Sequence, residues 1–77
     1  MSDSIKHYLG IRDWHAVEAS NVFPTWASFE WFVRQHRDEL IQSGQFIPRR
    51  GSGGSLAGPR LGEIVVDILR REAKEAA

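Results

Sequence analysis

The segment of residues 46–60 is the most basic part of the sequence, because it holds no acidic residue. Its basic side chains are Arg49, Arg50 and Arg60. The rest of the chain carries a slight excess of acid, so the formal net charge is zero. Guanidinium groups without neighbouring carboxylates bind phosphate well, and glycines let the backbone approach a ligand closely. We therefore expect phosphate contacts here. The alternative is a solvated basic turn that keeps an edge strand from pairing.

No catalytic or metal-binding motif is present in the sequence. Gly53 and Gly58 have the spacing of a phosphate-binding P-loop, but proline and arginine follow where the motif requires lysine and then serine or threonine. The histidines have no cysteine partners and lack the spacing of metal ligands. They are His7, His15 and His36. No serine lies in the context of an activated nucleophile. The sequence therefore predicts a protein that is not an enzyme and that binds no metal or cofactor.

Two helices are predicted before the basic segment. A short helix over residues 13–20 begins at Asp13, which is an acceptable N-cap. A long helix over residues 25–43 begins at Thr25 and ends before Gly44. One face of the long helix collects the side chains that we expect in the core or at its boundary. These are Trp26, Phe29, Phe32, Val33, His36 and Leu40.

A small hairpin and a further helix are predicted after the long helix. Residues 45–57 form a two-stranded β-hairpin around the glycine-rich turn, with Pro48 marking an edge strand. A C-terminal helix covers residues 59–75, with Pro59 in its first turn. Its apolar stripe consists of Leu61, Ile64, Val65, Ile68 and Leu69. We expect residues 1–12 to form a partly flexible N-terminal arm.

Length and composition limit the class of protein. A chain of 77 residues forms one small domain. Hydrophobic residues make up 42% of it, which is enough to build a core. The absence of cysteine excludes disulfides and thiolate metal sites. No apolar run is long enough for a membrane helix, and the N-terminus lacks the apolar core of a signal peptide. We therefore expect a cytoplasmic protein with no membrane partner.

The predicted order of helix, turn, helix, hairpin and helix resembles winged helix-turn-helix DNA-binding domains, in particular the small excisionase-like and MerR-like modules of phages and integrative elements. The residues that carry the resemblance are FPTWASFEWFVRQHRDELIQSGQFIPRRGSGGSLAGPRLGEIVVDIL, residues 23–69. The resemblance implies that the long helix recognises double-stranded DNA in the major groove and that residues 45–57 are the wing. It implies a non-catalytic excisionase-like architectural factor, or a small transcriptional regulator of a mobile element. The long second helix and the glycine-serine tip of the wing depart from the family pattern.

The candidate DNA contacts lie on two elements. Base and phosphate contacts from the start of the long helix are expected at Thr25, Ala27, Ser28 and Arg34. The alternative for Arg34 is an ion pair with Glu30 or Asp38, one turn away on a solvated face. Contacts from the wing and just beyond it are expected at Arg49, Arg50, Ser52 and Arg60. One small domain buries little DNA surface, so we expect cooperative or dimeric binding.

Two apolar side chains outside the predicted core indicate a rival function. Trp31 lies on the polar face of the long helix, and Val66 lies off the apolar stripe of the last helix. Exposed apolar side chains are typical of interfaces. For Trp31 three roles remain open: self-association, packing beneath the N-terminal arm around Tyr8 and Leu9, and contact with nucleic acid. The rival function is a small protein-binding module, such as a phage-encoded inhibitor, anchored by Trp31 and Val66.

Overall fold

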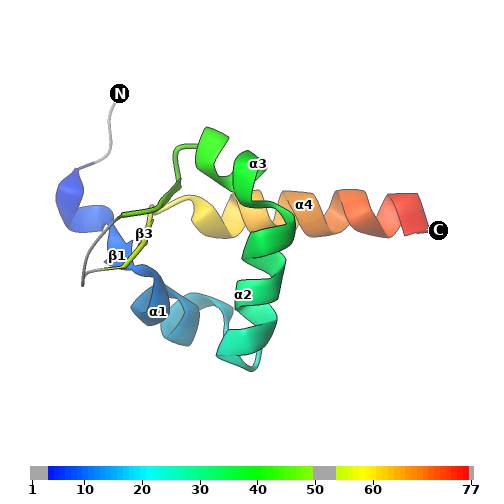
Figure 1. Ribbon diagram of the computed structural model, residues 1–77, viewed down its shortest axis with the longest axis horizontal. Coiled ribbons are helices and arrows are strands. Elements are labelled where there is room, and N and C mark those ends of the chain that lie inside the picture. The colour runs from blue at the N-terminus through cyan, green and yellow to red at the C-terminus, as the bar shows by residue number, and fades with distance from the viewer. Residues whose placement is uncertain (1–3, 50–53, 77) are drawn as a thin grey trace.

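The computed structural model of the chain describes residues 4–49 and 54–76, arranged as Figure 1 shows. These residues are mostly helical, with one small antiparallel sheet. The elements in chain order are η1 (Ile5–His7), β1 (Leu9–Gly10), α1 (Ile11–Trp14), η2 (His15–Ala19), α2 (Trp26–Gln35), α3 (Arg37–Gln42), β2 (Phe46–Ile47), β3 (Leu56–Ala57) and α4 (Leu61–Ala76). In both described ranges, no helix combines the length and the apolarity needed to cross a membrane.

The sheet has three strands in the order β1-β3-β2, so the expected two-stranded hairpin was an incomplete prediction. β2 and β3 form that hairpin. β1 pairs with the other side of β3, with Leu9 opposite Ala57. Just after β1, the amide of Ile11 donates a hydrogen bond of 2.9 Å to the carbonyl of Ser55. Residues 9–11 of the segment that we expected to be a partly flexible arm are therefore joined to the hairpin by backbone pairing.

The first helix begins earlier and is less regular than the sequence predicts. α1 begins at Ile11 rather than at Asp13, because β1 leads directly into it. From His15 the chain continues as a π-helix, a form that usually occurs as one turn within an α-helix. The buried His15 ring donates through Nε2 to the carbonyl of Phe23 at 2.6 Å and stacks on Phe29 with 5.3 Å between ring centres. His15 therefore joins the core to the turn that precedes α2.

The ends of the long predicted helix are confirmed. The Thr25 hydroxyl accepts a hydrogen bond of 3.1 Å from the amide of Ser28, which makes Thr25 the N-cap. Gly44 lies in the left-handed region, with φ of 79°, where a side chain would strain the backbone.

The middle of that helix differs from the prediction. The predicted single helix over residues 25–43 is two helices, α2 and α3, which meet at His36. The His36 backbone leaves helical geometry, with φ of −126° and ψ of 24°, and its amide is shared between the carbonyls of Phe32 and Val33. The His36 ring instead donates through Nε2 to Glu72 of α4 at 3.0 Å. A tertiary contact with a distant helix therefore accompanies the break.

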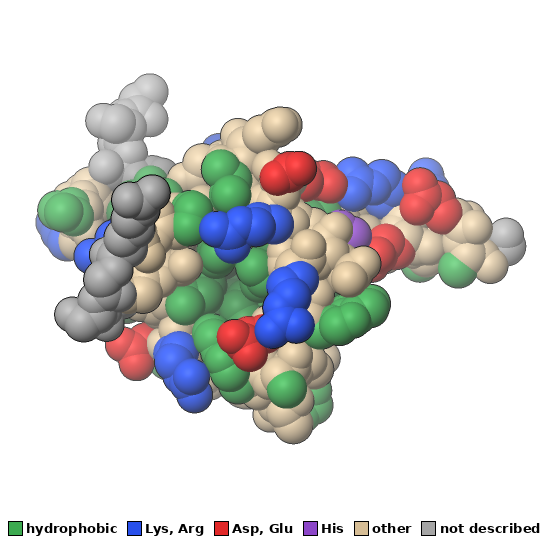
Figure 2. All heavy atoms as spheres, viewed as in Figure 1, with side chains coloured by type: hydrophobic (Ala, Val, Ile, Leu, Met, Phe, Trp, Pro, Cys, Tyr) green, Lys and Arg blue, Asp and Glu red, His purple; other side chains and the backbone are tan. Residues whose placement is uncertain are grey.

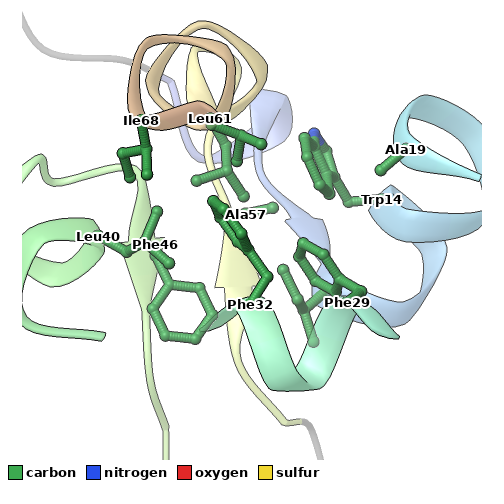
Figure 3. Close-up of a cluster of buried hydrophobic side chains, with 11 residues drawn as sticks. Trp14, Ala19, Phe29, Phe32, Leu40, Phe46, Ala57, Leu61 and Ile68 are labelled. Atoms are coloured by element: carbon green, nitrogen blue, oxygen red, sulfur yellow. The ribbon is translucent and has the colours of Figure 1, made fainter. Parts of the chain in front are cut away.

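The core lies between α2, α4 and the sheet, as Figure 3 shows. Phe29 and Phe32 of α2 point toward the same space as Leu61 and Ile68 of α4, and all four are buried. The predicted core faces of both long helices are thereby confirmed. α4 begins at Leu61, two residues after the predicted start, and ends at Ala76. In Figure 1 the C-terminal half of α4 extends beyond the other elements.

Two polar contacts hold α4 to the α2–α3 junction. One is the bond between His36 and Glu72 described above. In the other, the Arg71 guanidinium donates hydrogen bonds of 2.8 and 2.5 Å to the Glu39 carboxylate of α3. This bidentate pair lowers the pKa of Glu39 below its usual 4.5 and raises the pKa of Arg71.

Candidate nucleic-acid interface

A hollow of about 200 Å³ opens between α2 and the β2–β3 hairpin, and we call it the helix–hairpin hollow. Its apolar lining consists of Ile11, Trp26, Phe29, Val33 and Phe46. Its polar lining consists of Glu30, Arg34, Arg37 and Ser55. Figure 2 shows hydrophobic side chains in a depression near the middle of the visible face, with Lys or Arg side chains around it. An apolar floor with a basic rim suits a ligand that is both anionic and partly apolar, as a nucleic acid is.

Two guanidinium groups line the helix–hairpin hollow, and a third lies beside it. Arg34 and Arg37 line it directly. Arg12 of α1 lies over the ring of Trp26, with 4.6 Å between its guanidinium carbon and the ring centre. Because Trp26 lines the hollow, this cation–π contact fixes Arg12 beside it. The three side chains come from three different helices, α1, α2 and α3.

Arg34 is an expected site residue that the structure places at the hollow. The alternative prediction for it was an ion pair with Glu30 or Asp38. Within residues 4–49 and 54–76 neither pair forms, although Arg34 is exposed. Its guanidinium is therefore not neutralised by its own helix.

The other expected contacts on α2 lie at its first turn. Thr25 and Ala27 are exposed, and Ser28 is half-buried. The Ser28 hydroxyl donates to the carbonyl of Thr25 at 2.8 Å, while the Thr25 hydroxyl caps the helix. Both hydroxyls therefore serve the cap, and Glu30 and Arg34 lie further along the same helix with exposed side chains.

The expected contacts on the hairpin are described only in part. Arg49 is exposed, and its Nε donates to the carbonyl of Gly54 at 2.7 Å, which bridges the two sides of the glycine-rich turn. Arg50 and Ser52 lie outside the described residues. Arg60 lies just before α4 and pairs with Glu63 at 3.0 Å. From the sequence we placed Arg60 in the segment without acidic residues. In the structure Glu63, three residues later, supplies a carboxylate to it.

The two candidate interface residues are both exposed. Trp31 is 60% exposed, so packing beneath Tyr8 and Leu9 is excluded for it. Val66 is 41% exposed and lies on α4. The other two roles of Trp31, in self-association and in contact with nucleic acid, remain predictions.

Sequence reasoning missed Arg12, Arg37 and Glu30 as members of this site. A signal for two of them was present, because Glu30 and Arg37 share a flank of the helix with Trp26 and Val33 at spacings of three or four residues. For Arg12 no local signal existed. Its place depends on β1, which pairs with a strand far along the chain.

In the described ranges no three His, Asp or Glu side chains gather in a way that could hold a metal ion. Comparison of the chain with protein-family models, with curated proteins and with solved structures gives no match.

Proposed function

We propose that this chain is a non-catalytic protein that binds double-stranded DNA as a winged helix, with α2 in the major groove and the β2–β3 hairpin as the wing. The order of elements supports this proposal. The strand β1, the helical segment of α1 and η2, the helices α2 and α3, and the β2–β3 hairpin follow one another, and the hairpin closes a sheet of order β1-β3-β2. A helix beside a basic hairpin is the arrangement with which such domains meet a groove and its flanking backbone.

The observation that carries the proposal is the group of three arginines at the helix–hairpin hollow, two in its lining and one over the Trp26 ring that also lines it. A sugar-phosphate strand that passes between a helix in the major groove and an adjacent wing would meet Arg12 and Arg37, and Arg34 would lie close to the same strand on the exposed side of α2. Contacts of this kind supply most of the salt-dependent affinity for DNA. The three arginines place positive charge on one face of the molecule, although the formal net charge of the whole chain is zero.

The class of factor follows from the small size of this face. A single module of this kind contacts few base pairs, so useful affinity requires a neighbouring copy or partner on the same DNA. An excisionase-like architectural factor or a small regulator of a mobile element works in this way, and we propose that role.

The test is a salt series of binding to duplex DNA with two matched double variants. Arg12→Gln with Arg37→Gln removes two cations from the rim of the hollow. Affinity should fall for every duplex alike, and the slope of log affinity against log salt should flatten by about two units.

The control double variant, Arg70→Gln with Lys74→Gln, removes two exposed cations from α4. It should retain the wild-type affinity and slope, and circular dichroism should show equal helix content in all three proteins. Equal losses in both double variants would mean that charge in general, and not this face, attracts the DNA. The proposed interface would then be wrong.

A protein-binding module is the second candidate, because Trp31 is 60% exposed in the middle of α2. Aromatic side chains of this kind anchor many protein interfaces. If the wild type bound no duplex DNA even at low salt, this candidate would take first place.

A further inference from the structure

Glu30 is an acidic side chain among the arginines of the helix–hairpin hollow, where a purely phosphate-binding surface would carry no carboxylate. Its carboxylate lines the same hollow as Arg34 and Arg37, and it would repel a DNA backbone that approaches them. A structural role for Glu30 would require an ion pair with one of these arginines. Within the described ranges Glu30 forms no ion pair or hydrogen bond through its side chain. Its presence in a basic hollow therefore needs another explanation.

Glu30 and Arg34 stand one turn apart on the exposed side of α2. Residues four apart on a helix lie about 6 Å apart along its axis, which corresponds to about two base-pair steps of a duplex. The hydroxyls of Thr25 and Ser28 serve the helix cap, and Ala27 carries no polar group. Of the first three turns of α2, Glu30 and Arg34 thus offer a carboxylate acceptor and a bidentate donor on one face.

We propose that Glu30 and Arg34 determine the base preference of this protein, by recognising a C·G pair and a G·C pair within about two steps of each other. In the major groove a carboxylate accepts from the N4 amino group of cytosine, and an arginine donates to O6 and N7 of guanine. A carboxylate at this place lowers affinity for guanine and thymine, which present acceptor oxygens there, so this repulsion adds to the discrimination. This inference rests on the proposed DNA binding and deepens it.

The experiment is a selection of duplexes from a random pool by the wild type and by Glu30→Gln. The wild type should enrich a C·G pair at one position and a G·C pair close by. The side-chain oxygen of glutamine accepts from the N6 amino group of adenine, and its amide group donates to N7. Glu30→Gln should therefore change the preference at the first position alone, from C·G to A·T, by about tenfold in relative affinity.

A matched control is Glu75→Gln, the same change at an exposed position near the end of α4. It should leave the selected sequence unchanged. Because Glu30 is exposed and lies within α2, the substitution should preserve helix content, which circular dichroism checks.

Two other results would overturn the inference, and they differ from each other. If Glu30→Gln selects the wild-type sequence and only binds all duplexes more tightly, Glu30 merely repels phosphate, and the inference fails while DNA binding stands. If the wild type enriches no duplex at all, the proposed function itself fails and this inference fails with it.

Discussion

Among the glycines that the structure describes, Gly58 leaves the least room for an added side chain. A methyl group at Gly58 would collide with the side-chain oxygen of Gln45 and would lie 3.1 Å from Cε2 of Tyr8. The collision matters because Gln45 joins the end of the hairpin to α4: its backbone carbonyl accepts from Gly58 at 2.7 Å, and its side chain accepts from the amide of Arg60 at 2.8 Å. Glycine is therefore required at position 58 by the packing around it rather than by its backbone conformation.

We predict that Gly58→Ala lowers the free energy of unfolding by about 1–3 kcal/mol, the usual cost of an added methyl group in a packed site. Urea denaturation measures it. Gly62→Ala is the matched control, since its added methyl group would lie 4.0 Å from the Trp14 ring and within α4. There alanine should stabilise by about 0.5–1 kcal/mol. Destabilisation of the same size in both variants would contradict the packing explanation.

Individual residues were predicted best where local chemistry decides. Thr25 was expected to cap a helix and Gly44 to end one, and both predictions follow from backbone groups within a few positions. Phe29 was expected in the core from its spacing along α2 and is buried there. The placement of Arg12 over Trp26 was not predictable in this way, because two elements must first be packed before the contact exists.

The number and boundaries of helices and strands were predicted less well than individual residues. The errors arise where contacts between residues distant in sequence decide the local structure. Leu9–Gly10 contains no strand signal of its own and becomes β1 only because the open side of β3 accepts it. The break at His36 has neither glycine nor proline to mark it, and it coincides with the bond to Glu72 of α4. Such boundaries depend on the finished fold.

The junction between α3 and α4 should make stability depend on pH. Glu39 has a folded-state pKa below its usual 4.5, because Arg71 donates two hydrogen bonds to it. A carboxylate with a lowered pKa stabilises the fold fully above about pH 4.5, and this stabilisation is lost as the pH falls through the lowered value. We predict that Arg71→Gln is less stable than the wild type at pH 7 and that the difference shrinks at about pH 3.

Urea midpoints of the two proteins at both pH values test this prediction. Arg70→Gln serves as control, since Arg70 pairs with Asp67 on its own helix at 3.8 Å and both side chains are highly exposed. Exposed pairs of this kind contribute little. A gap between wild type and Arg71→Gln that stays constant from neutral to acidic pH would show that Arg71 acts by packing alone.

The whole molecule presents Trp31 to solvent on the helix that we place in the major groove. If self-association on DNA uses this ring, Trp31→Ala should shift the free protein toward monomer without loss of helix content. Sedimentation over a range of concentrations measures the shift, and Val66→Ala reports whether α4 takes part. A wild type that stays monomeric at the highest concentration would exclude self-association through Trp31. Contact with DNA or with another protein would then be the remaining roles of this side chain.

The central place of β3 in the sheet also dictates the order in which this chain can fold during its synthesis. β1 is made first, but its hydrogen-bonding partners lie at residues 56 and 57, and the core further requires Leu61, Val65 and Ile68 of α4. A growing chain therefore carries Trp14, Phe29 and Phe32 without their core partners from β3 and α4 until residues 56–68 have been synthesised. Contacts between residues so distant in sequence form late. Until they form, exposed aromatic side chains make the chain prone to aggregation and a target for chaperones. The nascent chain should thus depend on rapid packing once β3 and α4 have been made, more than a helical bundle whose contacts join neighbouring segments.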